Sequence, residues 1–382
     1  MAISGQTTFP EQNLLETRIG DLSSIQTTSE KGICGADVPA RYMGATFFKV
    51  ISSMNISHDP YDGTMSNPTF DLVQWPYPEL VKKLQQNILN LLENVQARNG
   101  ISLERLEGVT IVPNLIEALQ TFDAGYPSDH AAAMRDAVMG RMITTLRDGR
   151  VQGHIFLPID VAFQIAMEDS PTRRTCEYML VHECTHVQDL EMRAQVLSSS
   201  EILTPPLPQP IALCLQIVWN EYAASRLSGY VHPGQLADYQ ELLRQSTATL
   251  ISSRKNLSSL WAPTPEGRST ALTAALNLAL PVLQAFTYLF GHCRGIDAQL
   301  AENAPENFTV LTAASSIREA FRALEEQLDS LWARRNAWTG FIEFEQLAAL
   351  NCELIRLLTG VVMAPQANGG LAVGFWAGAF AQ

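Results

Sequence analysis

Charge is scarce in this sequence, and positive charge is the scarcer sign. Charged residues make up 17% of the 382 residues, with 26 Lys and Arg against 39 Asp and Glu, which gives a formal net charge of −13. A field of that sign repels phosphate backbones and no Lys/Arg-rich run reverses it locally, so we expect no nucleic-acid partner. Because 46% of the residues are hydrophobic, the chain can bury a large core.

Cysteine is sparse and unpatterned. The six cysteines are Cys34, Cys176, Cys184, Cys214, Cys293 and Cys352. They form no CxxC pair, and a chain of this length needs no disulfide framework, so we predict reduced thiols. The N-terminal residues also lack a basic stretch followed by an apolar core. We therefore expect a cytoplasmic protein, or one exported without a conventional signal peptide.

Long apolar runs are absent with one exception, which extends from Leu272 to Phe290. This stretch is long enough to span a bilayer. However, Asn277, Pro281 and Gln284 interrupt it, and no basic cluster marks a cytoplasmic flank. A helix buried inside a folded core explains the same pattern. We therefore expect no stable membrane insertion, and the sequence makes no prediction of the oligomeric state.

Hydrophobic patterning and turn residues divide the chain into a mixed first half and a helical second half. Residues 1–40 are rich in Ser, Thr, Gln and Gly and resemble a loosely ordered lead-in. Strands are predicted at 70–75, 109–112 and 151–157. Helices are predicted at 78–98, 131–147, 171–196, 211–227, 234–254, 271–292, 315–336 and 341–358. Residues 369–382 are apolar but show no pattern.

The predicted fold is therefore α+β and predominantly helical. A small mixed or antiparallel sheet would pack on the helix at 171–196, and the C-terminal half would be helical. Ser170 as N-cap and Pro171 at the first helical position mark the start of that helix.

The same helix carries the sequence His182-Glu183-Cys184-Thr185-His186. Histidines four residues apart project from one face of a helix, one turn apart, as two ligands of one Zn²⁺ must. Glu183 lies close enough to act as general base on a water at the metal. The flanking residues are uncharged, which indicates burial, and buried histidines need partners. A chance HxxxH pattern would have to combine all of these features.

A third ligand is expected in the predicted helix at 211–227. Glu221 is the one carboxylate on a face that otherwise carries small or apolar residues such as Cys214, Ala224 and Ser225. Burying a lone carboxylate is costly unless a cation offsets it, and zinc would be that cation. The alternative interpretation is an ordinary ion pair between Glu221 and Arg226 or another basic residue.

The pattern of His182, Glu183 and His186 followed by Asn220-Glu221 resembles the gluzincin branch of zinc metallopeptidases, which has the thermolysin-like architecture. The resemblance covers about residues 105 to 230. It implies that His182, His186 and Glu221 bind Zn²⁺ and that Glu183 is the general base. It also implies that Asp189 could orient a histidine. The resemblance suggests a zincin-like metallopeptidase domain at 41–262 and a helical C-terminal region at 263–382.

Two other families with related motifs are excluded. Asp189 and Met192 stand where the metzincin pattern needs Gly and His. The glycine-rich and Glu-Gly-Cys motifs of peptide deformylases are missing. The sequence also contains no P-loop, Rossmann glycine cluster or GxSxG elbow.

Several residues could supply the remaining parts of such a site. Tyr222, Tyr230, His232 and, more remotely, His292 are candidates for stabilising the oxyanion; we predict Tyr230 and His232, with packing or capping as their alternative role. Among other ligands, Glu191 lies on the same helix as the histidines and Glu201 lies in a predicted loop. Cys34 could cap the zinc and hold an enzyme latent.

These inferences favour a zinc-dependent hydrolase that cleaves a peptide or protein substrate. The strand ending at Leu157 precedes the helix with the metal motif and could bind such a substrate by adding the peptide as a further strand. The alternative is a non-catalytic zinc-binding scaffold with a protease-like fold, which would act in partner recognition or regulation.

Overall fold

The computed structural model describes residues 69–72, 78–99, 101–126, 140–167, 170–367 and 369–376. The described helices are α1 (Pro78–Asn99), α2 (Leu115–Thr121), α3 (Ile159–Ala166), α4 (Arg173–Ala194), α5 (Ser199–Leu203), α6 (Gln209–Ser228), α7 (Leu236–Ser253), α8 (Leu257–Leu260), α9 (Pro265–Gly295), α10 (Leu300–Asn303), α11 (Glu306–Leu311), α12 (Ser315–Ala333) and α13 (Ile342–Thr359). The described strands are β1 (Thr69–Leu72), β2 (Leu106–Val112), β3 (Arg141–Arg147), β4 (Arg150–Pro158), β5 (Val361–Pro365) and β6 (Leu371–Phe375). The predicted α+β, predominantly helical class is confirmed.

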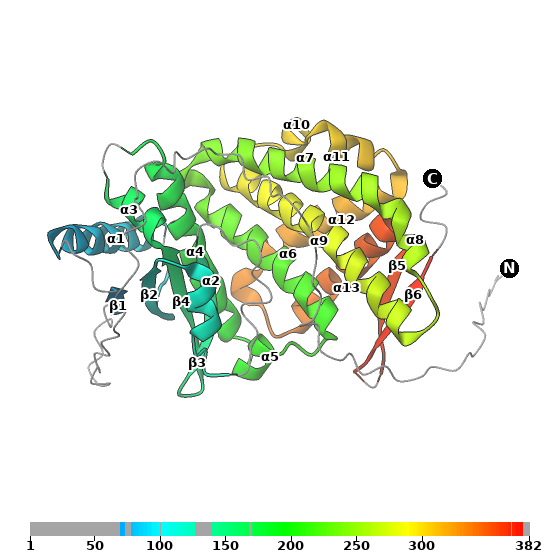
Figure 1. The fold of residues 1–382 in the computed structure, drawn as a ribbon, viewed down its shortest axis with the longest axis horizontal. Helices are drawn as coiled ribbons and strands as arrows, with labels where there is room; N and C mark the ends of the chain where they lie inside the picture. The colour runs from blue at the N-terminus through cyan, green and yellow to red at the C-terminus, as the bar shows by residue number, and fades with distance from the viewer. Residues whose placement is uncertain are drawn as a thin grey trace.

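The larger sheet lies at one end of the molecule and the β5–β6 hairpin at the other, with the long helices between them (Figure 1). Its strand order is β1-β2-β4-β3. The β1–β2 and β2–β4 pairs are parallel, whereas β3 and β4 form an antiparallel hairpin. The sheet is therefore mixed, and β1 and β3 are its edge strands in the described part of the chain.

Strand β3 contradicts the prediction of a helix at 131–147. The described part of that range, from residue 140, is extended, and residues 131–139 lie outside the described residues. Asp148 and Gly149 have φ angles of 49° and 77°, the positive values that a tight two-residue hairpin turn requires. This Asp-Gly turn ties β3 to β4, and β3 itself carries the β-branched residues Ile143, Thr144 and Thr145, which favour a strand.

The strand predicted at 151–157 exists as β4, but it lies between β2 and β3. Since its main-chain groups pair with a strand on each side, it has no edge to which a peptide could add. The prediction that this strand binds substrate is therefore wrong. Strands β3 and β4 both contact α4, and of these two β3 lies at the edge of the sheet in the described part of the chain.

Helix α4 lies between the sheet and the helical half of the molecule (Figure 1). One face carries Leu180, Cys184 and Val187, which pack in the core formed with α1, β2, β4 and α3. Tyr178 lies in the second core, formed with α6, α7, α9, α12 and α13. The helix begins at Arg173 with Thr172 as N-cap, so the predicted start at Ser170 and Pro171 is two residues early.

Helix α9 contains the apolar stretch predicted as a buried helix. It is the one described helix long and apolar enough to cross a membrane, and half of its most apolar window is buried inside the protein. A Cβ at Gly291 would lie 2.4 Å from the Tyr222 carbonyl oxygen, and one at Gly295 2.5 Å from that of Arg226. These glycines permit the close approach of α6 and α9, which brings polar residues of α9 to the side of Glu221.

The C-terminal hairpin of β5 and β6 was not predicted. Gly360 closes α13 in a left-handed conformation with φ of 78°, and the chain then turns into β5. The described residues of the predicted unpatterned end include β6, where Phe375 stacks on Trp261 with ring centroids 5.7 Å apart. Both strands are five residues long and show no alternation of polar and apolar residues, so they give little periodicity from which a strand could be predicted.

A polar cluster lies on the face of the sheet opposite α4, beside the apolar contacts of that face with α2. Glu107 accepts hydrogen bonds from Thr145 at 2.8 Å and from Arg147 at 2.6 Å. His154 lies 3.5 Å from Glu107 and hydrogen-bonds Thr110 at 2.7 Å. Burial raises the pKa of Glu107, but hydrogen bonds with His154, Arg147 and Thr145 outweigh this effect and lower it to about 2.

The Glu107 cluster predicts a defined acid dependence of stability. Because the folded-state pKa lies below the ordinary value of 4.5, the stabilisation is complete above pH 4.5 and is lost as the pH falls towards 2. Glu107→Gln should lower the free energy of unfolding by about 1–3 kcal/mol at pH 6, and by less at pH 3. Urea unfolding at both values measures this; exposed Glu302→Gln is the control. A deficit that does not shrink at pH 3 would contradict the account.

Candidate metal centre

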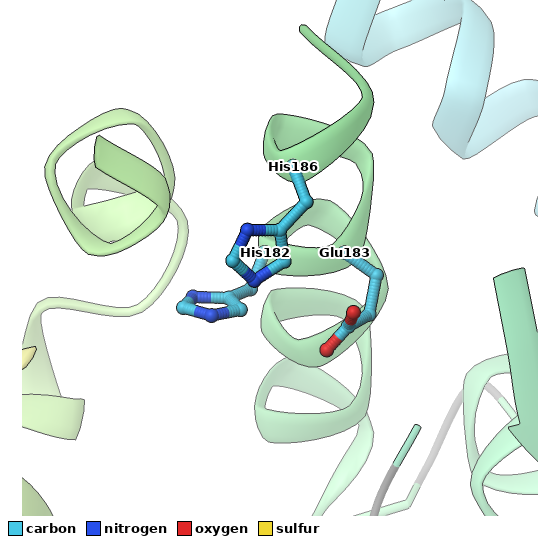
Figure 2. Close-up of side chains that lie close together, drawn as sticks. All are labelled: His182, Glu183 and His186. Carbon is cyan, nitrogen blue, oxygen red and sulfur yellow. The ribbon is translucent and has the colours of Figure 1, made fainter. Parts of the chain in front are cut away.

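His182 and His186 lie one turn apart on α4, and their imidazoles project to the same side of the helix (Figure 2). The ring centroids are 4.9 Å apart and the rings are nearly perpendicular, at 87°. Both are nearly buried, with 4% and 12% of their side chains exposed. Together with Glu183 they form a cluster whose ligand atoms lie within 4.8 Å of one another. The structure thus confirms a histidine–glutamate cluster that could hold a metal ion.

Glu221 on α6 faces both histidines. Its Oε2 lies 3.2 Å from His182 Nε2 and 3.7 Å from His186 Nε2. Two atoms that each lie about 2.1 Å from a tetrahedral metal ion are about 3.4 Å apart. The observed separations bracket this value, so the Glu221 carboxylate lies at about the distance from each imidazole that a shared metal ion would require.

The pKa values of these residues show how their charges act on one another. Burial favours the neutral form of His182, but the hydrogen bond and charge of Glu221 outweigh it and raise the His182 pKa. Burial lowers the pKa of His186 to about 3. For Glu221, the two histidines outweigh burial and lower the pKa to about 2. A positive charge beside Glu221 therefore favours its ionised form, and a bound cation would supply such a charge.

Contacts between α4 and α6 fix this geometry. Thr185 Oγ1 donates to the carbonyl oxygens of His182 at 2.7 Å and of Ala224, on α6, at 3.3 Å. Trp219 Nε1 donates to Asp189 at 2.6 Å, and Asp189 also pairs with Arg193 at 2.8 Å. Asp189 therefore joins the two helices rather than orienting a histidine, as the gluzincin resemblance implied.

Glu183 turns away from the imidazoles towards the outer strand of the sheet (Figure 2). Its Oε2 accepts a hydrogen bond of 2.6 Å from the backbone N–H of Met142 in β3. Burial raises the pKa of Glu183, while His182 and the Met142 N–H act in the opposite direction. A carboxylate with a raised pKa, held beside a metal-binding cluster, is suited to accept and return a proton.

Tyr288 and Gln284 on α9 complete the site, and sequence reasoning missed both. Gln284 Nε2 donates to Glu221 Oε1 at 3.3 Å and to the Tyr288 hydroxyl at 3.2 Å. The Tyr288 ring lies 5.8 Å from the His182 ring and stacks on Tyr239 at 5.0 Å. Burial, together with the charges of Glu221 and Glu183, raises the Tyr288 pKa well above its usual range. The missed signal is a polar pair at i and i+4 in an apolar helix.

The residues predicted to stabilise an oxyanion have the following contacts. Tyr222 is buried, and its hydroxyl donates to Asp329 at 2.7 Å. Tyr230 is 42% exposed in the 3-10 turn Gly229–Val231. The His232 ring lies 6.4 Å from the Tyr178 ring, and the His292 ring lies 6.0 Å from it. The Tyr178 ring in turn lies 6.1 Å from the ring of His182 and so stands between these histidines and the metal-binding pair.

The structure also shows the contacts of the residues that were considered as other partners or ligands. Arg226 pairs with Asp329 at 2.8 Å, so the alternative ion pair between Glu221 and Arg226 is not formed. Glu201 caps α5 through Ser198, and its carboxylate is engaged there. Cys34 lies outside the described residues.

Comparison of the chain with protein-family models, with curated proteins and with solved structures found no match. These comparisons therefore assign no family to the chain.

Proposed function

We propose that this protein is a zinc-dependent hydrolase of the gluzincin type, most simply a peptidase. The observation that carries the proposal is the position of Glu221 Oε2 opposite the Nε2 atoms of both His182 and His186. Two imidazoles and one carboxylate from a second helix are the three protein ligands of a catalytic zinc site that leaves one position open.

Each residue then has a defined role. When bound, Zn²⁺ would supply a Lewis acid that polarises a carbonyl group and lowers the pKa of water. Glu183 takes the proton from the attacking water and returns it to the leaving amine. The Met142 N–H holds the Glu183 carboxylate in place for both steps. Burial of the histidines excludes bulk water, which strengthens these electrostatic interactions.

The outer strand β3 is the proposed binding edge for an extended peptide. It pairs with β4 on one side, and Met142 on it contacts Glu183. A peptide adding to the outer edge would form main-chain hydrogen bonds that depend little on side-chain identity. Its carbonyl groups would then pass beside the metal centre.

Tyr288 is the proposed oxyanion donor, in place of Tyr230 and His232. Tyr288→Phe should lower kcat by about 100-fold, because one hydrogen bond to the developing oxyanion is lost. KM and zinc content should change little, since Phe retains the stacking on Tyr239. The matched control is Tyr222→Phe, which removes a hydroxyl bound to Asp329. Equal losses of kcat in the two variants would contradict the role of Tyr288.

The test of the proposed function is cleavage by the full chain with and without zinc. Denatured casein and carboxymethylated lactalbumin are incubated with chelator-treated and with zinc-restored protein, and new N-termini are identified by mass spectrometry. We expect cleavage only with zinc. A protein that is fully zinc-loaded and cuts neither substrate would contradict the proposal and support the scaffold alternative.

A further inference from the structure

Charged side chains line a hollow of about 420 Å³ in the helical half of the molecule. Small-molecule sites in proteins measure about 300–1,000 Å³, so this hollow has the size of such a site. Its lining includes Arg226 near the end of α6, Arg294 and Asp297 at the end of α9, and Asp329 and Trp332 on α12. None of these five residues belongs to the metal centre.

Asp329 fixes the two arginines of this hollow. Its Oδ1 accepts hydrogen bonds from Arg226 at 2.8 Å and from the Tyr222 hydroxyl at 2.7 Å, and its Oδ2 accepts one from Arg294 at 2.6 Å. The Arg226 guanidinium also lies 4.8 Å from the centroid of the Trp332 ring, within the range of a cation–π contact. Because Tyr222 is buried, this network is anchored in the core. A ligand would therefore meet arginines that are already ordered, which lowers the entropy cost of binding.

Both arginines retain unused hydrogen-bond donors. Among the described residues, Arg226 donates only through Nη1 and Arg294 only through Nη2. A guanidinium carries five N–H donors, so the other nitrogens of both groups can bind a ligand. Hydrogen bonds from a guanidinium to a carboxylate are stronger than those between neutral groups, and they are often formed in parallel pairs.

Asp297 contributes a negative charge to the same hollow. It follows α9 with a φ of 56°, and it is exposed. In the described part of the chain its side chain forms no hydrogen bond or ion pair, whereas Asp329 is bound by both arginines. A ligand with only a negative charge would be repelled by Asp297, and one with only a positive charge would be repelled by the arginines. A ligand that carries both charges has a partner for each.

We propose that this hollow binds a small zwitterion, either a free amino acid or a short peptide, with its carboxylate on Arg226 and Arg294 and its ammonium group on Asp297. The inference goes beyond the proposed function, because the site requires no metal and none of the residues of the metal centre. The two kinds of ligand share their charged ends and differ in the distance between them.

Three zwitterions without a peptide bond test this site by calorimetry on the full chain. Leucine has the charge spacing of a free amino acid, δ-aminovaleric acid that of a dipeptide, and ω-aminocaprylic acid that of a tripeptide. The carboxamide of each compound lacks the negative charge, and its N-acetyl derivative lacks the positive charge. Comparison of these derivatives on the wild-type chain does not depend on the folding of any variant.

The variants are Arg294→Gln and Asp297→Asn, and Arg322→Gln is the matched control. Asparagine adopts a positive φ as readily as aspartate does, so Asp297→Asn keeps the turn after α9. Arg322 is an arginine of α12 with 77% of its side chain exposed, and it pairs with Glu326 on the same helix. Unchanged thermal unfolding shows that each variant is folded.

At least one zwitterion should bind the wild-type chain about tenfold more tightly than its carboxamide and its N-acetyl derivative, because each derivative lacks one charged contact. The zwitterion that binds most tightly shows whether an amino acid or a peptide is the ligand. Arg294→Gln and Asp297→Asn should each weaken its binding by about tenfold, and Arg322→Gln should not. Arg294→Gln should leave the affinity for the carboxamide unchanged, since the lost contact is the one that the carboxamide never makes.

Four results would overturn the inference: no binding of any zwitterion at millimolar concentration, equal affinities for a zwitterion and its derivatives, an affinity that either variant leaves unchanged, or binding that is lost when zinc is removed by a chelator. The last result would place the ligand at the metal centre. The proposed function is tested separately by cleavage, so its failure would leave this site unaffected.

Discussion

Glu183→Gln is expected to abolish hydrolysis while zinc stays bound. Glutamine has the same shape, and its side-chain oxygen can still accept the hydrogen bond from the Met142 N–H. It cannot take a proton from water, however, and general base catalysis contributes about 10²–10⁴-fold to such reactions. We expect kcat to fall by about 10³-fold or more at unchanged zinc stoichiometry. Steady-state rates and metal analysis on the same preparation measure both quantities.

The control for this variant is Glu177→Gln on the same helix. Glu177 pairs with Arg173 at 2.7 Å, lies about 1.7 turns before Glu183 on α4, and takes no part in the centre. Its replacement should leave kcat unchanged, which shows that the loss of one carboxylate from α4 has no general effect. A normal rate in zinc-loaded Glu183→Gln would contradict the mechanism.

Glu221→Ala is expected to remove most of the zinc affinity and with it the stabilisation that zinc provides. Replacing groups that merely hydrogen-bond a metal ligand lowers affinity by about 10–100-fold, so loss of a ligand should lower it by at least about 100-fold. In the wild-type chain, free zinc at 1,000 times its Kd stabilises the folded state by about 4 kcal/mol. In Glu221→Ala the same zinc concentration should shift the unfolding transition far less.

Chelator competition and thermal unfolding with and without zinc measure the Glu221 effect. Glu241→Gln is the control, since it removes an exposed carboxylate of α7 that pairs with Arg244. Exposed pairs contribute about 0–1 kcal/mol, so this variant should keep the zinc-induced shift. A shift of wild-type size in Glu221→Ala would show that Glu221 is no ligand.

The sequence predicted the site best where the residues of a single helix are enough to determine their arrangement. The spacing of His182 and His186 requires only a helix to bring them to one face, and α4 provides it. Glu221 could be named because a lone carboxylate among small residues needs a cation, and this argument depends on one helix face. The structure then places it opposite both histidines, 35 residues beyond the second of them in the sequence.

The rest of the site depends on contacts between distant segments. Strand β3 takes its place beside α4 through its pairing with β4. The Met142 N–H reaches Glu183 because of that placement. Tyr288 comes more than 100 residues after His182, and it reaches the centre because α9 packs closely on α6 through Gly291 and Gly295. Nothing in the local pattern of α9 specifies that neighbour.

X-ray absorption at the zinc K-edge of the purified full chain tests the central claim most directly. The account predicts two imidazole nitrogens at about 2.0–2.1 Å and oxygen ligands at about 2.0–2.2 Å, with the oxygen contribution reduced in Glu221→Ala. A sulfur ligand at about 2.3 Å, or a shell without imidazole nitrogen, would contradict a centre built from His182, His186 and Glu221.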